Sequence, residues 1–124
     1  MADSYLFVFS NPTQGNDDEF NSWYETRHVP DVLQVDGVIA AQRYELAPMT
    51  PPEADGIAAP PAPAHRYLAV YELDDDPDTV MGSFLERVGS GQMALSDSLD
   101  LAGVSMAVWR PRGERKTAEA RTRG

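Results

Sequence analysis

Residues 19–38 read EFNSWYETRHVPDVLQVDGV, and this stretch decides the fold. Three large aromatic residues recur at the spacing of one helical face: Phe20, Trp23 and Tyr24. Pro30 lacks a backbone N–H, so a helix cannot continue past it without a kink. Gly37 marks the opening of a strand. The stretch therefore predicts an aromatic-faced helix that places His28 near its end and leads into a strand from residue 38.

A strand and a start signal precede this helix. Residues 4–10 are aromatic and β-branched, which is typical of a strand. Asn16 can cap the helix, and Glu19, three residues later, completes a capping-box pattern. Acidic side chains in the first turn complement the positive end of the helix dipole. We therefore expect the helix to begin near residue 17.

A second strand–helix unit follows the first. Asp76 and Pro77 have the pattern of a helix cap and a first helical residue. An apolar stripe continues from there to residue 88, and the following Gly-Ser-Gly ends the helix. The remaining strands are expected at 38–46, 65–73 and 103–109, with a short helical turn within 93–101. The intervening residues 47–64 hold six of the ten prolines and predict a semi-rigid or disordered loop.

The order of elements is β-α-β followed by β-α-β, the ferredoxin-like pattern of the α+β class. It predicts a four-stranded antiparallel sheet with both helices on one face. A sheet with one wet face alternates apolar and polar residues. The first strand does not, since Tyr5, Phe7 and Phe9 point one way while Leu6 and Val8 point the other. We therefore predict a homodimer in which a second copy covers the helix-free face.

Composition and charge limit the domain organisation and the classes of partner that the protein can have. The chain predicts one domain over residues 1–109 and a separate tail over 110–124. Residues 1–109 carry a net charge of −14, which disfavours nucleic acid and anionic membranes as partners. The tail carries +4 and can bind RNA or a protein, but its lack of apolar periodicity favours a disordered segment. There is no cysteine, no apolar run long enough to cross a membrane and no secretory pattern, so we expect a cytoplasmic protein.

Six short motifs of the first half carry a resemblance to a known group: Glu19-Phe20, Trp23-Tyr24, His28-Val29-Pro30, Val32-Leu33, Gly37-Val38 and Tyr44. With them the chain resembles the dimeric α+β barrel superfamily, and most of all its EthD-like branch, named for ethyl tert-butyl ether degradation. Over residues 4–46 many individual residues match the family pattern, whereas over 65–109 only the architecture matches. The loop at 47–64 and the tail differ from the compact arrangement of the family. It implies a homodimer with a pocket between the two sheets. The superfamily includes polyketide cyclases, muconolactone isomerases, monooxygenases and haem-degrading enzymes.

His28 is the candidate catalytic residue. An imidazole titrates near neutral pH and can give or take a proton, as a cofactor-free isomerisation or cyclisation requires. The resemblance implies a position at the end of the first helix, near the cavity between the sheets. The alternative interpretation is a structural histidine that bonds a backbone carbonyl and anchors the turn before Pro30.

Trp23, Tyr24 and Arg27 are the candidate substrate-binding residues on the helix. The two aromatic side chains can wall a site for a flat, apolar ligand, or they can pack into the core, as their helical spacing also predicts. Arg27 falls in the middle of the apolar face. It can hold a ligand carboxylate or enolate oxygen, or it can pair with a sheet carboxylate such as Glu45 or Glu72, and we favour pairing.

The strands contribute four more candidate substrate-binding residues. Tyr5, Tyr67 and Tyr71 are assigned to like faces of their strands, and Phe7 shares the face of Tyr5. If that face lines the interior, the phenols either stabilise an enolate or satisfy one another through buried hydrogen bonds. Two further residues can reach the cavity, although the second is expected to be exposed: Arg43 and His65.

Neither a metal nor another cofactor is expected. The two histidines lie thirty-seven residues apart, and the acidic run at 74–78 lacks the alternation of a calcium-binding loop. We therefore predict a cofactor-independent lyase, isomerase or cyclase, including dehydratase and decarboxylase chemistry, acting on a small apolar or polyketide-like metabolite in the inter-sheet pocket. One alternative is a non-catalytic small-molecule-binding or accessory protein of a degradative or biosynthetic pathway. A second, by analogy with the superfamily, is a monooxygenase-like or haem-handling barrel.

Overall fold

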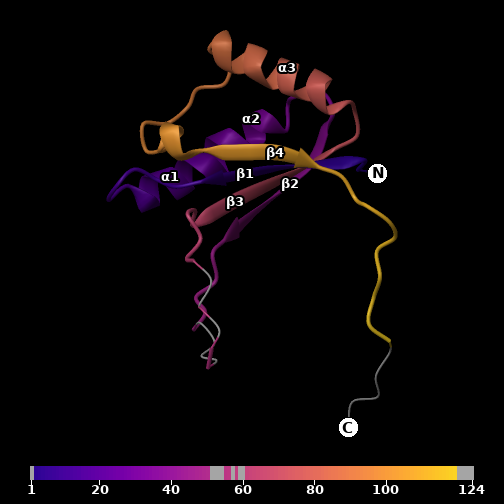
Figure 1. Ribbon diagram of the computed structural model, residues 1–124. Helices are drawn as coiled ribbons and strands as arrows, with labels where there is room; N and C mark the ends of the chain where they lie inside the picture. The colour runs from indigo at the N-terminus through magenta and orange to yellow at the C-terminus, as the bar shows by residue number, and fades with distance from the viewer. Residues whose placement is uncertain (1, 51–54, 57, 59–60, 120–124) are drawn as a thin grey trace.

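The computed structural model describes residues 2–50, 55–56, 58 and 61–119 of the chain. A four-stranded sheet carries the helices on one side only (Figure 1). In chain order the elements are β1 (Ser4–Ser10), α1 (Asp17–Trp23), η1 (Tyr24–His28), α2 (Val29–Val32), β2 (Val38–Glu45), β3 (Tyr67–Leu73), α3 (Pro77–Gly89), η2 (Leu101–Gly103) and β4 (Ser105–Trp109). This order confirms the ferredoxin-like α+β fold.

The sheet has the strand order β2-β3-β1-β4, and each pair of neighbours is antiparallel. In the middle of the sheet Leu6 lies opposite Tyr71 on one side and Val108 on the other. This row packs against the helices, and Leu6 and Tyr71 belong to the core. Because successive side chains on a strand point to opposite faces, the next row faces away from the helices. That row consists of Tyr5, Glu72 and Trp109.

The first helix continues from residue 17 to residue 32 with a π-helical turn, η1, in its middle. Hydrogen bonds in a π turn close over five residues instead of four, so the turn holds an additional residue. The inward positions therefore follow every four residues, and all four are buried: Phe20, Tyr24, His28 and Val32. Arg27 is exposed. Its predicted place on the apolar face is wrong because that prediction assumed uniform α-helical spacing.

The ends of this helix differ in part from the predictions. The helix continues past Pro30 after the irregular π turn: Pro30 occupies the first turn of α2, and Leu33 N–H still bonds to Val29 O at 3.0 Å. The π turn just before Pro30 has already displaced the α-helical hydrogen bond that a proline removes. Asn16 does not cap the helix with its side chain. Its Nδ2 donates instead to Thr13 Oγ1 at 2.6 Å.

The second half of the chain follows the predicted pattern more closely. Asp76 caps α3, and its Oδ2 accepts a hydrogen bond from the Thr79 backbone N–H at 3.1 Å. The helical turn expected within 93–101 is not present there; a 3-10 turn, η2, lies later, at Leu101–Gly103. The segment between α3 and η2 nevertheless packs firmly, since Met93 is buried and Leu99 forms an isolated bridge with Pro12. This segment closes the end of the helical layer over the sheet.

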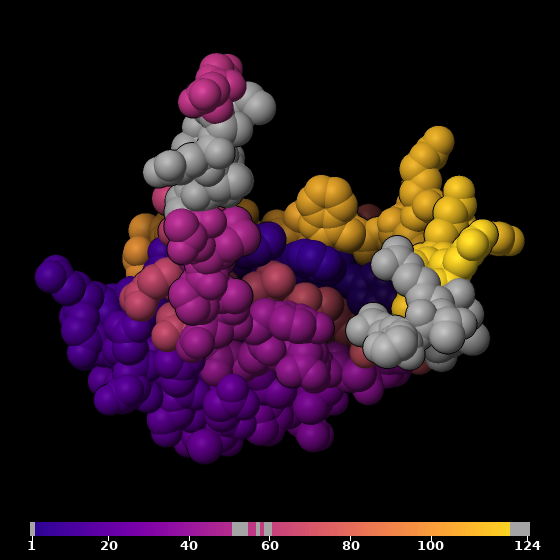
Figure 2. All heavy atoms as spheres, turned by 90° about the horizontal axis from the view of Figure 1, so that it is seen from below, coloured from indigo at the N-terminus to yellow at the C-terminus, as the bar shows by residue number. Residues whose placement is uncertain are grey.

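The helix-free face of the sheet is open and apolar. Its larger apolar side chains are Tyr5, Phe7, Phe9, Tyr44, Leu68, Val70 and Trp109. Figure 2 shows this face as a hollow between two projections. One projection belongs to the loop between β2 and β3, and the other belongs to the tail after β4, of which residues 110–119 hold no helix or strand. The predictions of a semi-rigid or disordered loop and of a disordered tail also include residues 51–54, 57, 59–60 and 120–124. These residues lie outside the described part of the chain.

Gly37 offers a test of how α3 and β2 pack together. Its φ is +94°, and a Cβ there would lie 2.7 Å from Val80 Cγ2 and 3.0 Å from Asp75 Cβ. Gly15 has a similar φ of +81° but no heavy atom within 4 Å of such a Cβ.

We expect Gly15→Ala to cost about 1 kcal/mol of unfolding free energy from backbone strain, and Gly37→Ala to cost about 3 kcal/mol because overpacking adds to the strain. Urea denaturation measures both, and equal losses would contradict this packing.

Candidate functional site

Three polar side chains meet in an apolar cavity between the sheet and the helices. His28 and Tyr24 come from η1, and Tyr71 comes from β3. The cavity has a volume of about 70 Å³. Its apolar lining comes from strands, from α3 and η2, and from loops: Leu6, Val8, Phe84, Leu95, Leu99, Leu101, Val104 and Met106. The space is sufficient for a few water molecules and is smaller than an ordinary ligand pocket.

His28 is enclosed by aromatic rings. Its ring stacks on Trp23 with centroids 4.6 Å apart and 24° between the planes, and it stands nearly perpendicular to Tyr24 at 5.0 Å. Only 6% of the residue is exposed. Burial lowers the pKa of His28 to about 4, because a charged imidazole loses its hydration there. His28 is therefore neutral at pH 7, and its Nδ1 has no hydrogen-bond partner among the described residues.

Tyr71 and Tyr24 are neutral phenols in the same cavity. Burial raises the pKa of both hydroxyls, so neither ionises near neutral pH. His28 Nδ1 is buried without a hydrogen-bond partner in the described part of the chain. The Tyr71 hydroxyl makes no hydrogen bond of ordinary geometry there either, but the Tyr24 hydroxyl lies near enough to raise the pKa of Tyr71 further, after burial. A buried polar group left unpaired costs about 1 to 3 kcal/mol. Two such groups on one small apolar cavity indicate a place prepared for a polar atom that the protein itself does not supply.

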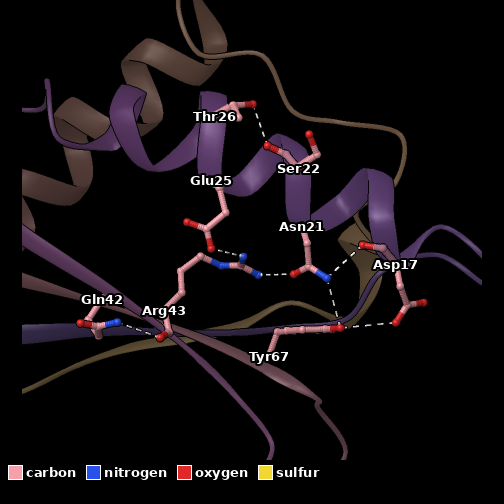
Figure 3. Close-up of polar contacts among 8 residues, drawn as sticks. All are labelled: Asp17, Asn21, Ser22, Glu25, Thr26, Gln42, Arg43 and Tyr67. Carbon is pink, nitrogen blue, oxygen red and sulfur yellow. Dashed lines mark hydrogen bonds and ion pairs between the residues drawn. The ribbon is translucent and has the colours of Figure 1, made fainter.

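Arg43 holds Tyr24 from the side away from the cavity. Its guanidinium carbon lies 4.4 Å from the centre of the Tyr24 ring. Arg43 Nη1 bonds to Glu25 Oε1 at 2.8 Å, and Nη2 bonds to Asn21 Oδ1 at 2.9 Å (Figure 3). A cation over an aromatic face is attracted by the ring quadrupole. Arg43 thus has the place at the helix–sheet interface that the sequence analysis gave to Arg27.

The network continues along the outer edge of α1 and away from the cavity. Asn21 Nδ2 lies 3.2 Å from the Tyr67 hydroxyl, which in turn lies 3.4 Å from Asp17 Oδ2 (Figure 3). Arg66 Nη1 also bonds to Asp17 Oδ2 at 2.7 Å, and this hydrogen bond lowers the pKa of Asp17. The Tyr67 phenol is therefore a structural tie between β3 and α1.

The structure brings together fewer of the predicted site residues than the sequence suggested. His28, Tyr24 and Tyr71 meet at the cavity, and Trp23 supports His28 from behind. Tyr5 and Phe7 lie on the opposite face of the sheet and line a shallow groove there. The assignment of Tyr5 to the face of the β3 tyrosines is wrong. In the observed register Tyr5 pairs with Glu72, whereas Leu6 pairs with Tyr71.

The location of the pocket is corrected as well. His28 lies on the helical side of the sheet, so the cavity that it lines lies within one copy and not between two sheets. Arg27 makes no ion pair with Glu45 or Glu72; the ion pairs in the described residues are Arg43–Glu25 and Arg66–Asp17. His65 is half-buried at the far end of the sheet, where its Nε2 lies 2.7 Å from Gly103 O.

The cavity offers both an acceptor and donors of hydrogen bonds. The neutral imidazole offers a nitrogen lone pair that can accept from a hydroxyl, and the two phenols offer O–H donors to a carbonyl or hydroxyl oxygen. The described residues hold no group of three or more His, Asp or Glu side chains close enough to ligate a metal ion. In the same part of the chain, no helix has the length and apolar character needed to cross a membrane.

Comparison with known proteins adds evidence about the fold. No family model matches the sequence, and no curated protein matches it. HapK from Hahella chejuensis superposes with a TM-score of 0.50 at 13% identity, over 93% of this chain and 98% of HapK. An EthD family protein from Bacillus halodurans C-125 gives a TM-score of 0.47 at 12% identity, over 94% of this chain and all of the other. The likeness to HapK shows a shared fold.

The buried His28 makes a prediction about acid stability. Its pKa is about 4 in the folded chain and near 6.5 when unfolded. The unfolded state therefore binds more protons between these values, so this residue's contribution is full above pH 6.5 and is lost as the pH falls to 4. We expect wild type to lose about 3 kcal/mol more than His28→Phe over this range. Denaturant titrations at several pH values measure it, with His65→Phe as the control for losing a histidine. Equal losses in wild type and His28→Phe would contradict the burial of a neutral imidazole.

Proposed function

We propose that the cavity around His28 binds a small, neutral, largely apolar molecule through one carbonyl or hydroxyl oxygen. The observation that carries this proposal is the pair of buried, unpartnered polar atoms, His28 Nδ1 and the Tyr71 hydroxyl, on a cavity otherwise lined by apolar side chains. A ligand hydroxyl would satisfy both, by donating to a lone pair on His28 Nδ1 and accepting from the Tyr71 hydroxyl, whereas a carbonyl oxygen would accept from Tyr71 alone. A charged ligand does not suit the site, because its hydration would be lost without a counter-charge in the cavity.

Proton transfer next to a carbonyl is the reaction that these groups support best. His28, kept neutral by burial, would accept a proton from the carbon beside the carbonyl and return it at another position. The Tyr71 hydroxyl would donate a hydrogen bond to the carbonyl oxygen as enolate charge develops, and Tyr24 would assist from η1. Isomerisation, cyclisation and dehydration all contain such a step. Trp23 would position the imidazole ring by stacking.

Binding without chemistry is the second candidate function. It is favoured by the direction of the pKa shifts: burial makes His28 a weaker base and makes both phenols weaker acids. Such groups are still effective neutral hydrogen-bonding partners. In that case the chain would carry or sequester the same class of molecule. Native mass spectrometry of freshly purified protein separates the two, because a carrier retains its ligand unchanged whereas an enzyme converts it.

A matched pair of tyrosine variants tests the site. Tyr71→Phe removes an unsatisfied buried hydroxyl, so we expect the free protein to gain about 1 kcal/mol of unfolding free energy while its occupancy by the co-purified ligand falls. Tyr67→Phe removes a hydroxyl that is bonded to Asn21 outside the cavity, so we expect it to lose about 1 kcal/mol with ligand occupancy unchanged. Urea denaturation and native mass spectrometry give the two readouts. A loss of stability in Tyr71→Phe would argue against a hydroxyl reserved for a ligand.

We also propose that a second copy of the chain covers the helix-free face. Aromatic and aliphatic side chains from β1, β3, β2 and β4 meet on this face, and Tyr44 and Trp109 are more than half exposed. An apolar patch of this kind on one side of a sheet usually marks an interface. We expect sedimentation at micromolar concentration to give about twice the chain mass of 13.6 kDa. A stable monomer would count against this arrangement.

A further inference from the structure

The cavity around His28 extends across the sheet and has two different ends. Its buried end lies over β3, where Tyr71 lines it together with His28 from η1. Its outer end lies over the edge strand β4, where Met106 lines it, and the cavity is partly open to solvent. β1 separates β3 from β4, and neighbouring strands are about 4.8 Å apart, so the two ends are about 10 Å apart.

Three large apolar side chains are exposed at the outer end of the cavity, and we call them the apolar rim. Leu95 belongs to the segment after α3, Leu101 to η2 and Met106 to β4, and they are 37%, 63% and 44% exposed. η2 leads into β4 on the helical side of the sheet (Figure 1). Neighbouring exposed apolar side chains often mark a binding surface, and these three continue the lining of a cavity.

The backbone holds the apolar rim in place. The Thr13 N–H donates to Ser98 O at 2.7 Å, and the Asp100 N–H donates to Asn11 O at 3.0 Å. These bonds tie the segment before η2 to the segment after β1. Leu101 is therefore exposed on an anchored part of the fold, so the rim is formed before a ligand arrives.

The charge around the rim favours a neutral ligand. Residues 88–109 contain Asp97 and Asp100 but no Lys, Arg or His. An anionic ligand group would meet these carboxylates at the outer end and a neutral imidazole at the buried end. It would therefore lose its hydration without gaining a counter-charge.

The buried end of the cavity has room for only part of an ordinary ligand. With a volume of about 70 Å³ the cavity is smaller than typical ligand pockets. A molecule whose oxygen bonds to His28 Nδ1 and the Tyr71 hydroxyl fills this end with its first few carbon atoms. Further carbon atoms have to lie toward β4, where the apolar rim can remove them from water.

We infer that the site selects neutral, chain-like molecules that carry an oxygen at one end and an unbranched apolar chain behind it. The oxygen enters first and bonds to His28 and Tyr71, and the chain crosses β1 and lies against the apolar rim. This inference rests on the oxygen-binding role proposed for His28 and Tyr71. It adds the substrate class and the residues that select for chain length.

Straight-chain primary alcohols from n-propanol to n-octanol test the chain-length dependence. Chemical-shift titration of the isotope-labelled full chain gives each dissociation constant. We expect each added methylene to lower the dissociation constant about threefold, somewhat less than complete burial gives, and octanoate to bind at least about tenfold more weakly than n-octanol. A dissociation constant that stops falling after n-butanol would overturn the role of the rim. Equal binding of octanoate and n-octanol would overturn the selection of neutral molecules.

A matched pair of leucine variants locates the chain. Leu101→Ser removes apolar surface from the rim, and we expect it to weaken n-octanol about fivefold more than n-propanol. Leu85→Ser is the control, since Leu85 is exposed to a similar extent on α3 but does not line the cavity. We expect this control to change the binding of neither alcohol. Equal weakening of n-octanol by both variants would overturn the contact between the chain and the rim.

Tyr71→Phe separates this inference from the proposed function. We expect it to weaken every alcohol by about the same factor, roughly fivefold for one hydrogen bond, with the gain per methylene retained. Chain-length dependence without any effect of Tyr71→Phe would overturn the proposed oxygen site and the oxygen-first orientation. Weakening by Tyr71→Phe without chain-length dependence would overturn the role of the rim alone. No binding of any alcohol up to its solubility would overturn both.

Discussion

The π-helical turn at Tyr24–His28 is the constraint on which the helical layer depends. Because it holds an additional residue, it places His28 one helical turn after Tyr24 on the buried face and moves Arg27 to the surface. The same turn lets the helix pass Pro30 and reach Val32 in the core. Without it, a charged guanidinium would face the sheet where a neutral imidazole now lies. Turns of this kind inside α-helices are frequent at functional sites, and here the turn carries two of the three polar groups of the cavity.

The two faces of the sheet have separate roles. The helical face encloses a small cavity within a single copy, with polar atoms from η1 and β3. The open face presents apolar side chains between two projecting segments, which suits a second copy. Since the cavity needs nothing from the open face, changes that weaken association should leave the His28 site intact. Arg43 belongs to the helical face, since it pairs with Ala69 in the row of Val8, and it holds Tyr24 from β2, an edge strand of the sheet.

Much of the fold could be predicted from local pattern, and the candidate site only in part. The aromatic helix, the Asp76 cap and the four strands follow from periodicity and turn residues, and they are present within a few residues of the expected bounds. His28 and Tyr24 were predictable as site residues because a histidine among aromatics is uncommon in this chain. Arg43 was named only as a residue that can reach the cavity, and its contact with Tyr24 was not predicted, because that contact depends on a ring that reaches it across the helix–sheet interface.

By itself, the sequence determined the order of elements, the apolar character of both sheet faces and the opposite charges of residues 1–109 and the tail 110–124. Only the tertiary structure decided which residues share a face across strands. Alternation relates Tyr5 to Phe7 within one strand, but the pairing register relates Tyr5 to Glu72 and Leu6 to Tyr71, and that register arises from packing against the helices. The π turn was likewise decided by packing, because the stretch around His28 is compatible with more than one helical spacing until the sheet selects which side chain is buried.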